Sequence, residues 1–260
     1  MPNTFISTLF VLTLFFLGMN SLTHAQSSDL TTKYKNQAES ALKLYRYLEA
    51  AQLFEKAAET EQNSPNPRFA VLFNMLVYSG NNYANIRQYA KALKLYEESL
   101  IISRKLGEEN EIAVILSKIG MLCQYLNQND MSLKYLEEAL SITRKLGQDG
   151  SVVKNLYAIG MLYYSWGQYD KALACYEESL AIARKLGKDS DISLNINNIA
   201  LVYHSRGQYD KALKNYEEAL SVNKKLGQEE RVATSLNNIG MVYRSWGQYD
   251  KALQYLEMAL

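Results

Sequence analysis

Paired glutamates are the most frequent residues in this sequence that could act together as a general acid and a general base. Two carboxylates do this work when their surroundings keep one protonated and the other ionised. The pairs recur at one place in a repeated segment, as Glu97-Glu98, Glu137-Glu138, Glu177-Glu178 and Glu217-Glu218. Because a catalytic site needs a single pair, the recurrence indicates a solvated helix face that carries the same charges in every repeat.

Histidine and cysteine are too few for nucleophilic catalysis or metal binding. Beyond residue 25 the sequence has one histidine, His204, so one copy of the chain cannot assemble a His-based triad or metal site. Cys123 and Cys175 lie at different places in neighbouring repeats, which favours two small buried side chains over a disulfide or a redox pair. We therefore predict no enzyme activity, no cofactor, no metal and no small-molecule substrate.

The elements that position these residues are set by a block of sequence that returns every 40 residues. A small residue marks the centre of each block: Gly80, Gly120, Gly160, Ala200 and Gly240. A fixed period of this size indicates a solenoid, in which each unit is stable only against its neighbours. The glycines thus belong to the repeat rather than to a phosphate-binding loop.

Charge and composition exclude two further classes. The 28 lysines and arginines are balanced by 27 aspartates and glutamates, and a net charge of +1 offers no basic face for nucleic acid. Disordered proteins combine few hydrophobic residues with a high net charge. This chain has 48% hydrophobic residues and a net charge of +1, so its composition is that of a folded protein.

Residues 151–187 show how one repeat is built. Ser151 is a favourable N-cap for a first helix, and apolar residues then recur at helical spacing until Gly167 interrupts them. A second helix begins near Tyr169 and ends at Gly187, a residue suited to the left-handed conformation that closes many helices. Each repeat is therefore predicted to be an antiparallel helix pair.

Small and aromatic residues at fixed places explain how such pairs could stack. Gly160 and Ala172 are predicted to face each other across the pair, because small side chains let helices approach closely. Glycine in a helix interior costs up to about 1 kcal/mol relative to alanine, so its recurrence suggests a packing requirement. The predicted packing residues are Gly80, Gly120, Gly160, Ala200, Gly240, Ala172, Ala212, Ala252, Tyr163, Tyr203 and Tyr243.

The order of glycine, tyrosine and alanine in each block resembles the tetratricopeptide repeat (TPR). The matching residues of one unit are Gly160, Tyr163, Gly167, Tyr169, Ala172, Tyr176 and Ser179. Most TPRs are 34 residues long, and the longer form found here is similar to the repeats of kinesin light chains, LGN-type G-protein modulators and bacterial sensory proteins. The resemblance implies an all-α superhelical solenoid of antiparallel helix pairs.

The predicted domain organisation follows from these repeats. Residues 26–67 are expected to form a divergent first helix pair with its loop, and residues 68–260 the TPR array. The units of the array are expected near 68–107, 108–147, 148–187, 188–227 and 228–260, the last of them incomplete.

Residues 1–25 resemble a secretory signal peptide. An apolar run from Phe5 to Met19 is followed by Thr23 and Ala25, which are the small residues expected before a cleavage site. The run is shorter than the roughly 20 apolar residues of a membrane span. Export to the periplasm or the medium is therefore predicted, with a membrane anchor at 5–19 as the alternative.

The TPR resemblance also implies where a partner would bind, since such arrays hold a peptide or partner helix in a concave groove lined by their first helices. The residues implied are Asn198, Asn238, Asn197, Asn237, Met161, Met241, Tyr164, His204 and Arg244. Asparagine can both donate to and accept from an extended backbone, and methionine adapts to apolar side chains. A solvated asparagine and a buried methionine are the structural alternatives.

The leading functional prediction is a non-catalytic scaffold that binds a protein or a peptide. One alternative is the extracytoplasmic sensory region of a longer signalling protein with a histidine kinase or DNA-binding output. A weaker alternative is a self-assembling structural subunit that associates through its C-terminal end.

Overall fold

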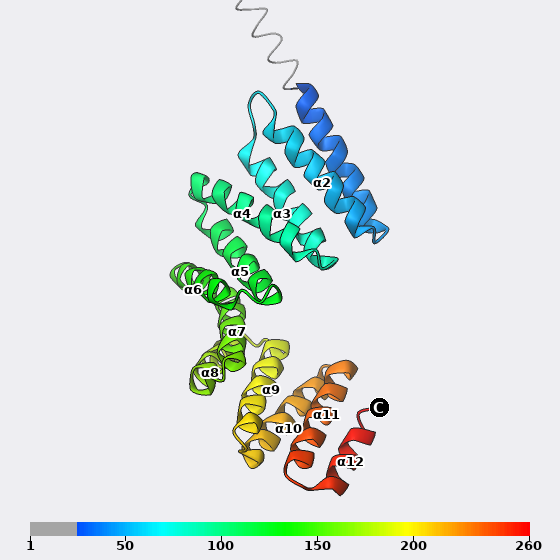
Figure 1. The fold of residues 1–260 in the computed structure, drawn as a ribbon, viewed down its shortest axis with the longest axis vertical. Coiled ribbons are helices and arrows are strands. Elements are labelled where there is room, and N and C mark those ends of the chain that lie inside the picture. The colour runs from blue at the N-terminus through cyan, green and yellow to red at the C-terminus, as the bar shows by residue number, and fades with distance from the viewer. Residues whose placement is uncertain (1–24) are drawn as a thin grey trace, which may run out of the picture. The chain divides into compact units, whose positions relative to one another are not determined.

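The computed structural model describes residues 25–260, and all regular secondary structure in that range is α-helical (Figure 1). The first helix covers residues 25–43. It is followed by α2 (Tyr47–Gln62), α3 (Phe69–Asn85), α4 (Tyr89–Leu106), α5 (Glu109–Tyr125), α6 (Asn129–Lys145), α7 (Asp149–Ser165), α8 (Tyr169–Lys185), α9 (Asp189–Ser205), α10 (Tyr209–Lys225), α11 (Glu229–Ser245) and α12 (Tyr249–Glu257). The prediction of an all-α fold is confirmed.

The predicted signal peptide lies outside the described residues, apart from Ala25. Among residues 25–260, no helix combines the length and the apolar character that crossing a membrane requires.

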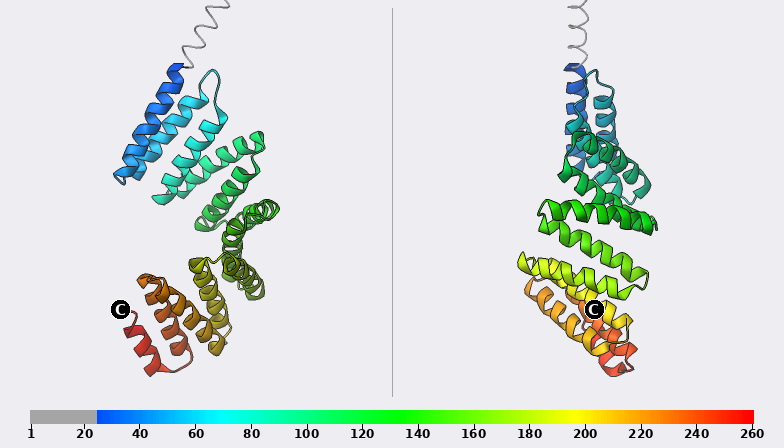
Figure 2. Two further views of the ribbon diagram at one scale, coloured as in Figure 1. Left: turned by 180° about the vertical axis from the view of Figure 1, so that it is seen from behind. Right: turned by 90° about the vertical axis from the view of Figure 1, so that its left-hand side faces the viewer.

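The chain forms two compact units, which divide between Gln128 and Asn129. In the first unit α2 packs on α3, α3 on α4 and α4 on α5. In the second unit each helix from α6 to α12 packs on the next one along the chain. Figures 1 and 2 show consecutive helices of each unit running antiparallel. Each unit is therefore a stack of helix pairs, which is the predicted solenoid arrangement.

Single residues in the left-handed conformation close the connections between helices. Gly187 has a φ of +63° beyond the end of α8, which confirms its predicted role in ending that helix. Gly167 has a φ of +69° between α7 and α8. In the first unit Tyr45, Arg87 and Asn127 adopt this conformation at turns of the same kind. Left-handed backbone costs a residue with a Cβ roughly 1–2 kcal/mol, so these turns are less favourable than those with glycine.

The prediction that Ser151 caps a first helix was wrong. α7 begins at Asp149, so Ser151 lies inside its first turn. The carboxylate of Asp149 supplies the negative charge that stabilises the N-terminus of a helix. Glu109, Asp189 and Glu229 occupy the corresponding places in α5, α9 and α11. The first helices α5, α7, α9 and α11 thus all begin with an acidic first turn, whereas α3 has no acidic residue there.

The central glycine of a first helix makes room for a large side chain of the second helix. A Cβ atom at Gly160 would lie 2.6 Å from Cε1 of Tyr176, and one at Gly80 would lie 2.7 Å from Cε1 of Tyr96. The atoms nearest to such a Cβ at Gly160 belong to the Tyr176 ring. At the corresponding Gly240 the backbone oxygen of Ala252 also lies within 3.2 Å, so the small residues of that helix pair approach each other closely. Ala172 is fully buried and packs in the same cluster as Tyr176.

Apolar clusters fill the space between the helices of the second unit. One cluster joins Tyr176 of α8 to Ile196 of α9, and the next is built around Tyr216 of α10. The half-buried Tyr163 and Tyr203 each pack against two successive clusters. These tyrosines connect one helix pair to the next, which explains their regular recurrence.

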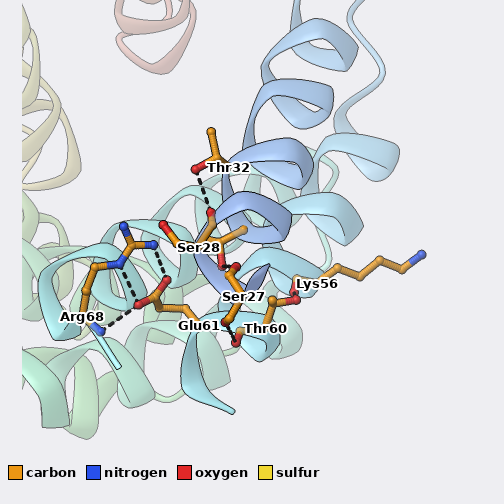
Figure 3. Close-up of polar contacts among 8 residues, drawn as sticks. Ser27, Ser28, Thr32, Lys56, Thr60, Glu61 and Arg68 are labelled. Carbon is orange, nitrogen blue, oxygen red and sulfur yellow. Dashed lines mark hydrogen bonds and ion pairs between the residues drawn. The ribbon is translucent and has the colours of Figure 1, made fainter. Parts of the chain in front are cut away.

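The loop between α2 and α3 is held by a buried carboxylate (Figure 3). The side chain of Glu61 is 1% exposed and accepts hydrogen bonds from the backbone N–H of Arg68 at 2.7 Å and from its Nη2 at 2.6 Å. These bonds hold the pKa of Glu61 below its ordinary value. The hydroxyl of Ser27 donates to the carbonyl of Thr60 at 3.1 Å, which ties the first helix to α2.

Candidate functional site

The predicted binding residues lie together on the first helices of the second unit, α7, α9 and α11. We define the first-helix face as the exposed and half-buried side chains that share their helical register. They are Lys154, Tyr157, Met161, Tyr164 and Ser165 on α7, Leu194, Asn197, Asn198, Leu201, His204 and Ser205 on α9, and Thr234, Asn237, Asn238, Met241, Arg244 and Ser245 on α11. The face thus contains every residue predicted to bind a partner.

The predicted residues differ in how far they reach solvent. Met161 is 42% exposed, and Asn237 and Arg244 are also exposed. The remaining predicted residues are half-buried: Met241, Tyr164, His204, Asn197, Asn198 and Asn238. The face therefore offers apolar, amide and cationic groups to a ligand.

Hydrogen bonds join neighbouring first helices across this face. The hydroxyl of Tyr164 on α7 lies 2.8 Å from Oγ of Ser205 on α9, and Nε2 of His204 lies 3.0 Å from Oγ of Ser245 on α11. Sequence reasoning did not identify the two serines. Their signal was the same 40-residue spacing that marks the glycines.

A further bond between these helices involves two of the predicted asparagines. Nδ2 of Asn238 on α11 donates to Oδ1 of Asn197 on α9 at 3.1 Å. Asn198 instead turns back to its own helix, where its Nδ2 donates to the carbonyl of Leu194 at 2.9 Å. The side-chain oxygen of Asn198 and both polar atoms of the exposed Asn237 are engaged in none of these bonds.

Aromatic rings from the second helices support the same end of the face. The ring centroids of Tyr164 and Tyr169 are 5.7 Å apart, and those of His204 and Tyr209 are 6.0 Å apart. The guanidinium of Arg206 lies over the ring of Tyr169 at 5.8 Å and pairs with Asp170. The half-buried rings of Tyr164 and His204 are thus each packed against the start of the helix that follows, whereas Tyr157 packs against Tyr176 further along α8.

Carboxylates are confined to one end of the helices that form the face. In α7, α9 and α11 every aspartate and glutamate lies in the first turn: Asp149, Asp189, Asp191, Glu229 and Glu230. The face itself carries two cations, Lys154 and Arg244, and the titratable His204. Its charge is therefore positive, although the whole chain is nearly balanced.

In the first unit α3 and α5 carry different polar and aromatic contacts from those of the second unit. Oδ1 of Asn81 accepts hydrogen bonds from the hydroxyl of Tyr96 at 2.7 Å and from Nζ of Lys118 at 2.8 Å. Tyr125 is 65% exposed and stacks on Tyr89 with a centroid separation of 4.8 Å. The two units therefore present first helices of different chemistry.

The pKa values of the two thiols and of His204 are shifted chiefly by burial. Burial raises the pKa of the Cys175 thiol to about 11 and also raises that of Cys123, so both thiols stay protonated at neutral pH. Desolvation lowers the pKa of His204. Among residues 25–260, no group of three or more His, Cys, Asp or Glu side chains has the geometry of a metal site.

This geometry defines a repeat scaffold of stacked helix pairs, and sequence comparison identifies its family. The tetratricopeptide repeat pattern matches residues 71–145, 111–185 and 191–260. These matches extend over most of the chain, and the chain belongs to the tetratricopeptide repeat family. A search of curated protein sequences found no match.

Solved structures show the same fold at low sequence identity. BtubC (BKLC) from P. vanneervenii aligns with a TM-score of 0.67 at 21% identity, over 80% of this chain and 92% of that one. The apo form of RapI aligns with a TM-score of 0.70 at 18% identity, over 93% of this chain and 75% of that one. A Rap protein complexed with Competence and Sporulation Factor aligns with a TM-score of 0.63 at 14% identity, over 87% and 72% of the respective chains.

Proposed function

We propose that this chain is a non-catalytic scaffold whose first-helix face binds an extended segment of a partner protein or a peptide. The observation that carries the proposal is the set of hydrogen bonds between first helices, from Tyr164 to Ser205, from His204 to Ser245 and from Asn238 to Asn197. These bonds hold polar side chains in place before a ligand arrives. A surface that is ordered in advance loses less side-chain entropy on binding.

The chemistry of the face suits an extended backbone with some apolar side chains. An extended segment exposes N–H and C=O groups, which the amides of Asn198, Asn237 and Asn238 can accept from and donate to. Met161 and Met241 can provide flexible apolar contacts to side chains of the bound segment. The Rap complex with Competence and Sporulation Factor supports ligand binding by a protein of this fold.

Selection from a phage-displayed library of random peptides, carried out on the full chain, tests the proposal. Binding of the selected peptides is measured by fluorescence anisotropy for the chain and for the Asn198→Ala and Asn238→Ala variants. A hydrogen bond is worth about 1 kcal/mol, so each variant should bind about fivefold more weakly.

Glu177→Gln is the matched control, because this exposed side chain lies on the second helix α8. It should leave binding unchanged, and thermal melts should show that all variants remain folded. Selected peptides that bind both asparagine variants as tightly as the original chain would contradict a binding role for the first-helix face.

We also propose that the scaffold is exported, because the run from Phe5 to Met19 and the small residues Thr23 and Ala25 have the pattern of a signal peptide. Expression in a Gram-negative host, followed by intact mass measurement and fractionation, tests this. Loss of residues 1–25 with recovery in the periplasm is the expected result. An intact N-terminus in the membrane fraction would favour the anchor, and in the cytoplasm it would exclude export.

A further inference from the structure

A row of three side chains crosses the first-helix face at the C-terminal ends of its helices. Tyr164, His204 and Arg244 occupy the same register in α7, α9 and α11. His204 is half-buried and Arg244 is exposed. Arg244 takes part in none of the salt bridges formed by the described residues of the second unit. The row thus offers one permanent cation beside a group that can become one.

The hydrogen bonds of Ser245 determine which nitrogen of His204 can take up a proton. The Ser245 hydroxyl donates to the carbonyl of Met241 at 2.9 Å, so its oxygen accepts from Nε2–H of His204 at 3.0 Å. A neutral histidine has one protonated nitrogen, so its lone pair is then on Nδ1. Protonation therefore occurs at Nδ1 and leaves the bond to Ser245 in place.

Among the residues that the structure describes, no charged neighbour contributes to the pKa shift of His204, which desolvation alone causes. The ring of Tyr209 on α10 packs against it with centroids 6.0 Å apart, and Tyr164 lies in the same row on α7. At the start of α8, Asp170 is paired with Arg206. Desolvation lowers the pKa of His204, so the ring is neutral at neutral pH.

We propose that His204 and Arg244 form a subsite for a carboxylate of the bound segment, and that filling the subsite takes up a proton at Nδ1 of His204. This inference rests on the proposed function of the first-helix face. The guanidinium of Arg244 matches a carboxylate in shape and charge, and the face presents no carboxylate of its own to compete. Acidic segments are therefore preferred over basic ones at this end of the face.

The pH dependence of binding follows from the direction in which a bound carboxylate shifts the pKa of His204. A bound carboxylate favours the charged imidazole and raises the pKa of His204 above its value in the free protein. Binding is then tightest below the pKa of the free protein and weakens as the pH rises through the pKa of the complex. An affinity about threefold higher near pH 5.5 than near pH 7.5 is expected.

The test follows the imidazole signals of the full chain by NMR, with His204→Gln used to separate the signal of His204 from that of His24. The probes are millimolar acetyl-Ala-Glu-Ala-amide, acetyl-Ala-Gln-Ala-amide and acetyl-Ala-Ala-Ala with a free carboxyl terminus. The glutamate probe is expected to raise the pKa of His204, and the glutamine probe to leave it unchanged. A response to the free terminus alone would assign the subsite to a C-terminal carboxylate, and a response to the glutamate probe alone to a side chain.

Variants separate the subsite from general electrostatics. Arg244→Gln should abolish the response of His204, whereas Lys154→Gln, which removes the other cation of the face, should preserve it. His204→Gln should bind the glutamate probe with the same affinity at both pH values. Equal responses to the glutamate and glutamine probes, or no response to any carboxylate, would overturn the subsite.

Peptides selected from the phage library distinguish failure of the carboxylate subsite from failure of the proposed scaffold function. If peptides without carboxylates bind the face and depend on Asn198 and Asn238, while no carboxylate probe changes the pKa of His204, the scaffold function stands and the subsite is rejected.

Discussion

Gly160 is the residue at which a single methyl group should matter most. Gly160→Ala places a Cβ atom 2.6 Å from the ring of Tyr176, which is fully buried and cannot move without disturbing its cluster. The clash outweighs the better helix propensity of alanine, and we expect a loss of about 1–2 kcal/mol in unfolding free energy. Urea denaturation followed by circular dichroism measures this change.

Gly240→Ala provides the comparison, because its Cβ would meet the side chain of Leu256 at 2.8 Å and only a looser backbone contact, the oxygen of Ala252 at 3.2 Å. Leu256 is half-buried and more mobile than an enclosed tyrosine ring, so the loss should be smaller. A larger loss at Gly240 than at Gly160 would show that the aromatic ring is not the reason for the glycine.

Glu61 should make the first unit sensitive to acid. The hydrogen bonds from Arg68 hold the pKa of Glu61 below its ordinary value of 4.5. The stabilisation is therefore complete above that value and is lost as the pH falls through the lower pKa of the folded state. Glu61→Gln should cost about 2 kcal/mol at neutral pH and flatten the acid dependence of stability.

Glu49→Gln is the control for Glu61, since Glu49 is exposed and lies 3.4 Å from Arg46 within the same region. A surface pair of this kind contributes less than about 1 kcal/mol. Thermal melts at a series of pH values compare the two variants. The same acid profile for both would mean that burial of Glu61 has no energetic consequence.

The turn between α3 and α4 could be made more stable by a single substitution. Arg87 has a φ of +61° and an exposed side chain. Glycine adopts this conformation without a steric penalty, so Arg87→Gly should stabilise the protein by about 1 kcal/mol. Asn127→Gly should gain less, because asparagine tolerates the left-handed region better than arginine does. The urea midpoints of the two variants test this order.

A buried polar network connects three helices of the second unit through Asn223. Its side chain is 3% exposed, accepts from the hydroxyl of Ser193 on α9 and donates to Oγ of Ser235 on α11 at 3.2 Å. Asn223→Ala leaves both buried hydroxyls without this partner, and we expect a loss of about 2–3 kcal/mol.

Asn215→Ala, in the same helix, is the control for Asn223. Asn215 donates to the carbonyl of Lys211 within α10, so its removal should change stability by less than about 0.5 kcal/mol. Differential scanning calorimetry of the two variants decides whether the network between helices contributes to stability.

Across the whole molecule, acidic residues are distributed by helix type in both units. In α5, α7, α9 and α11 they lie only in the first turn, whereas α4, α6, α8 and α10 carry a glutamate pair near their middle. This separation suggests that binding and folding can be changed independently. The double variant Met161→Glu with Asn237→Glu alters only exposed positions and should keep its stability within about 0.5 kcal/mol.

The same variant should bind the library-derived acidic peptides at least about tenfold more weakly, because like charges then meet across the interface. Glu177→Lys, on a second helix, should leave affinity unchanged. Salt screens charge repulsion but does not restore shape complementarity. Affinities measured at two salt concentrations therefore distinguish the two causes of weaker binding.

The helix pairs and their connections could be predicted from the sequence because their causes are local. The apolar spacing within 151–187 defines two helices, and Gly187 ends the second because its own backbone must turn left-handed. The all-α fold and the grouping of the predicted binding residues on first helices follow from the same period. The start of α7 could not be predicted from Ser151, since Asp149 stabilises an earlier start through the helix dipole.

Only the tertiary structure decided which distant side chains meet. It placed the ring of Tyr176 against Gly160, the serines at 205 and 245 against Tyr164 and His204, and Asn223 between two buried serines. These contacts join residues on different helices, and their distances depend on how closely the helices pack. The sequence by itself therefore determined the repeat and its helix pairs, whereas packing between helices decided how the polar groups of the first-helix face are held.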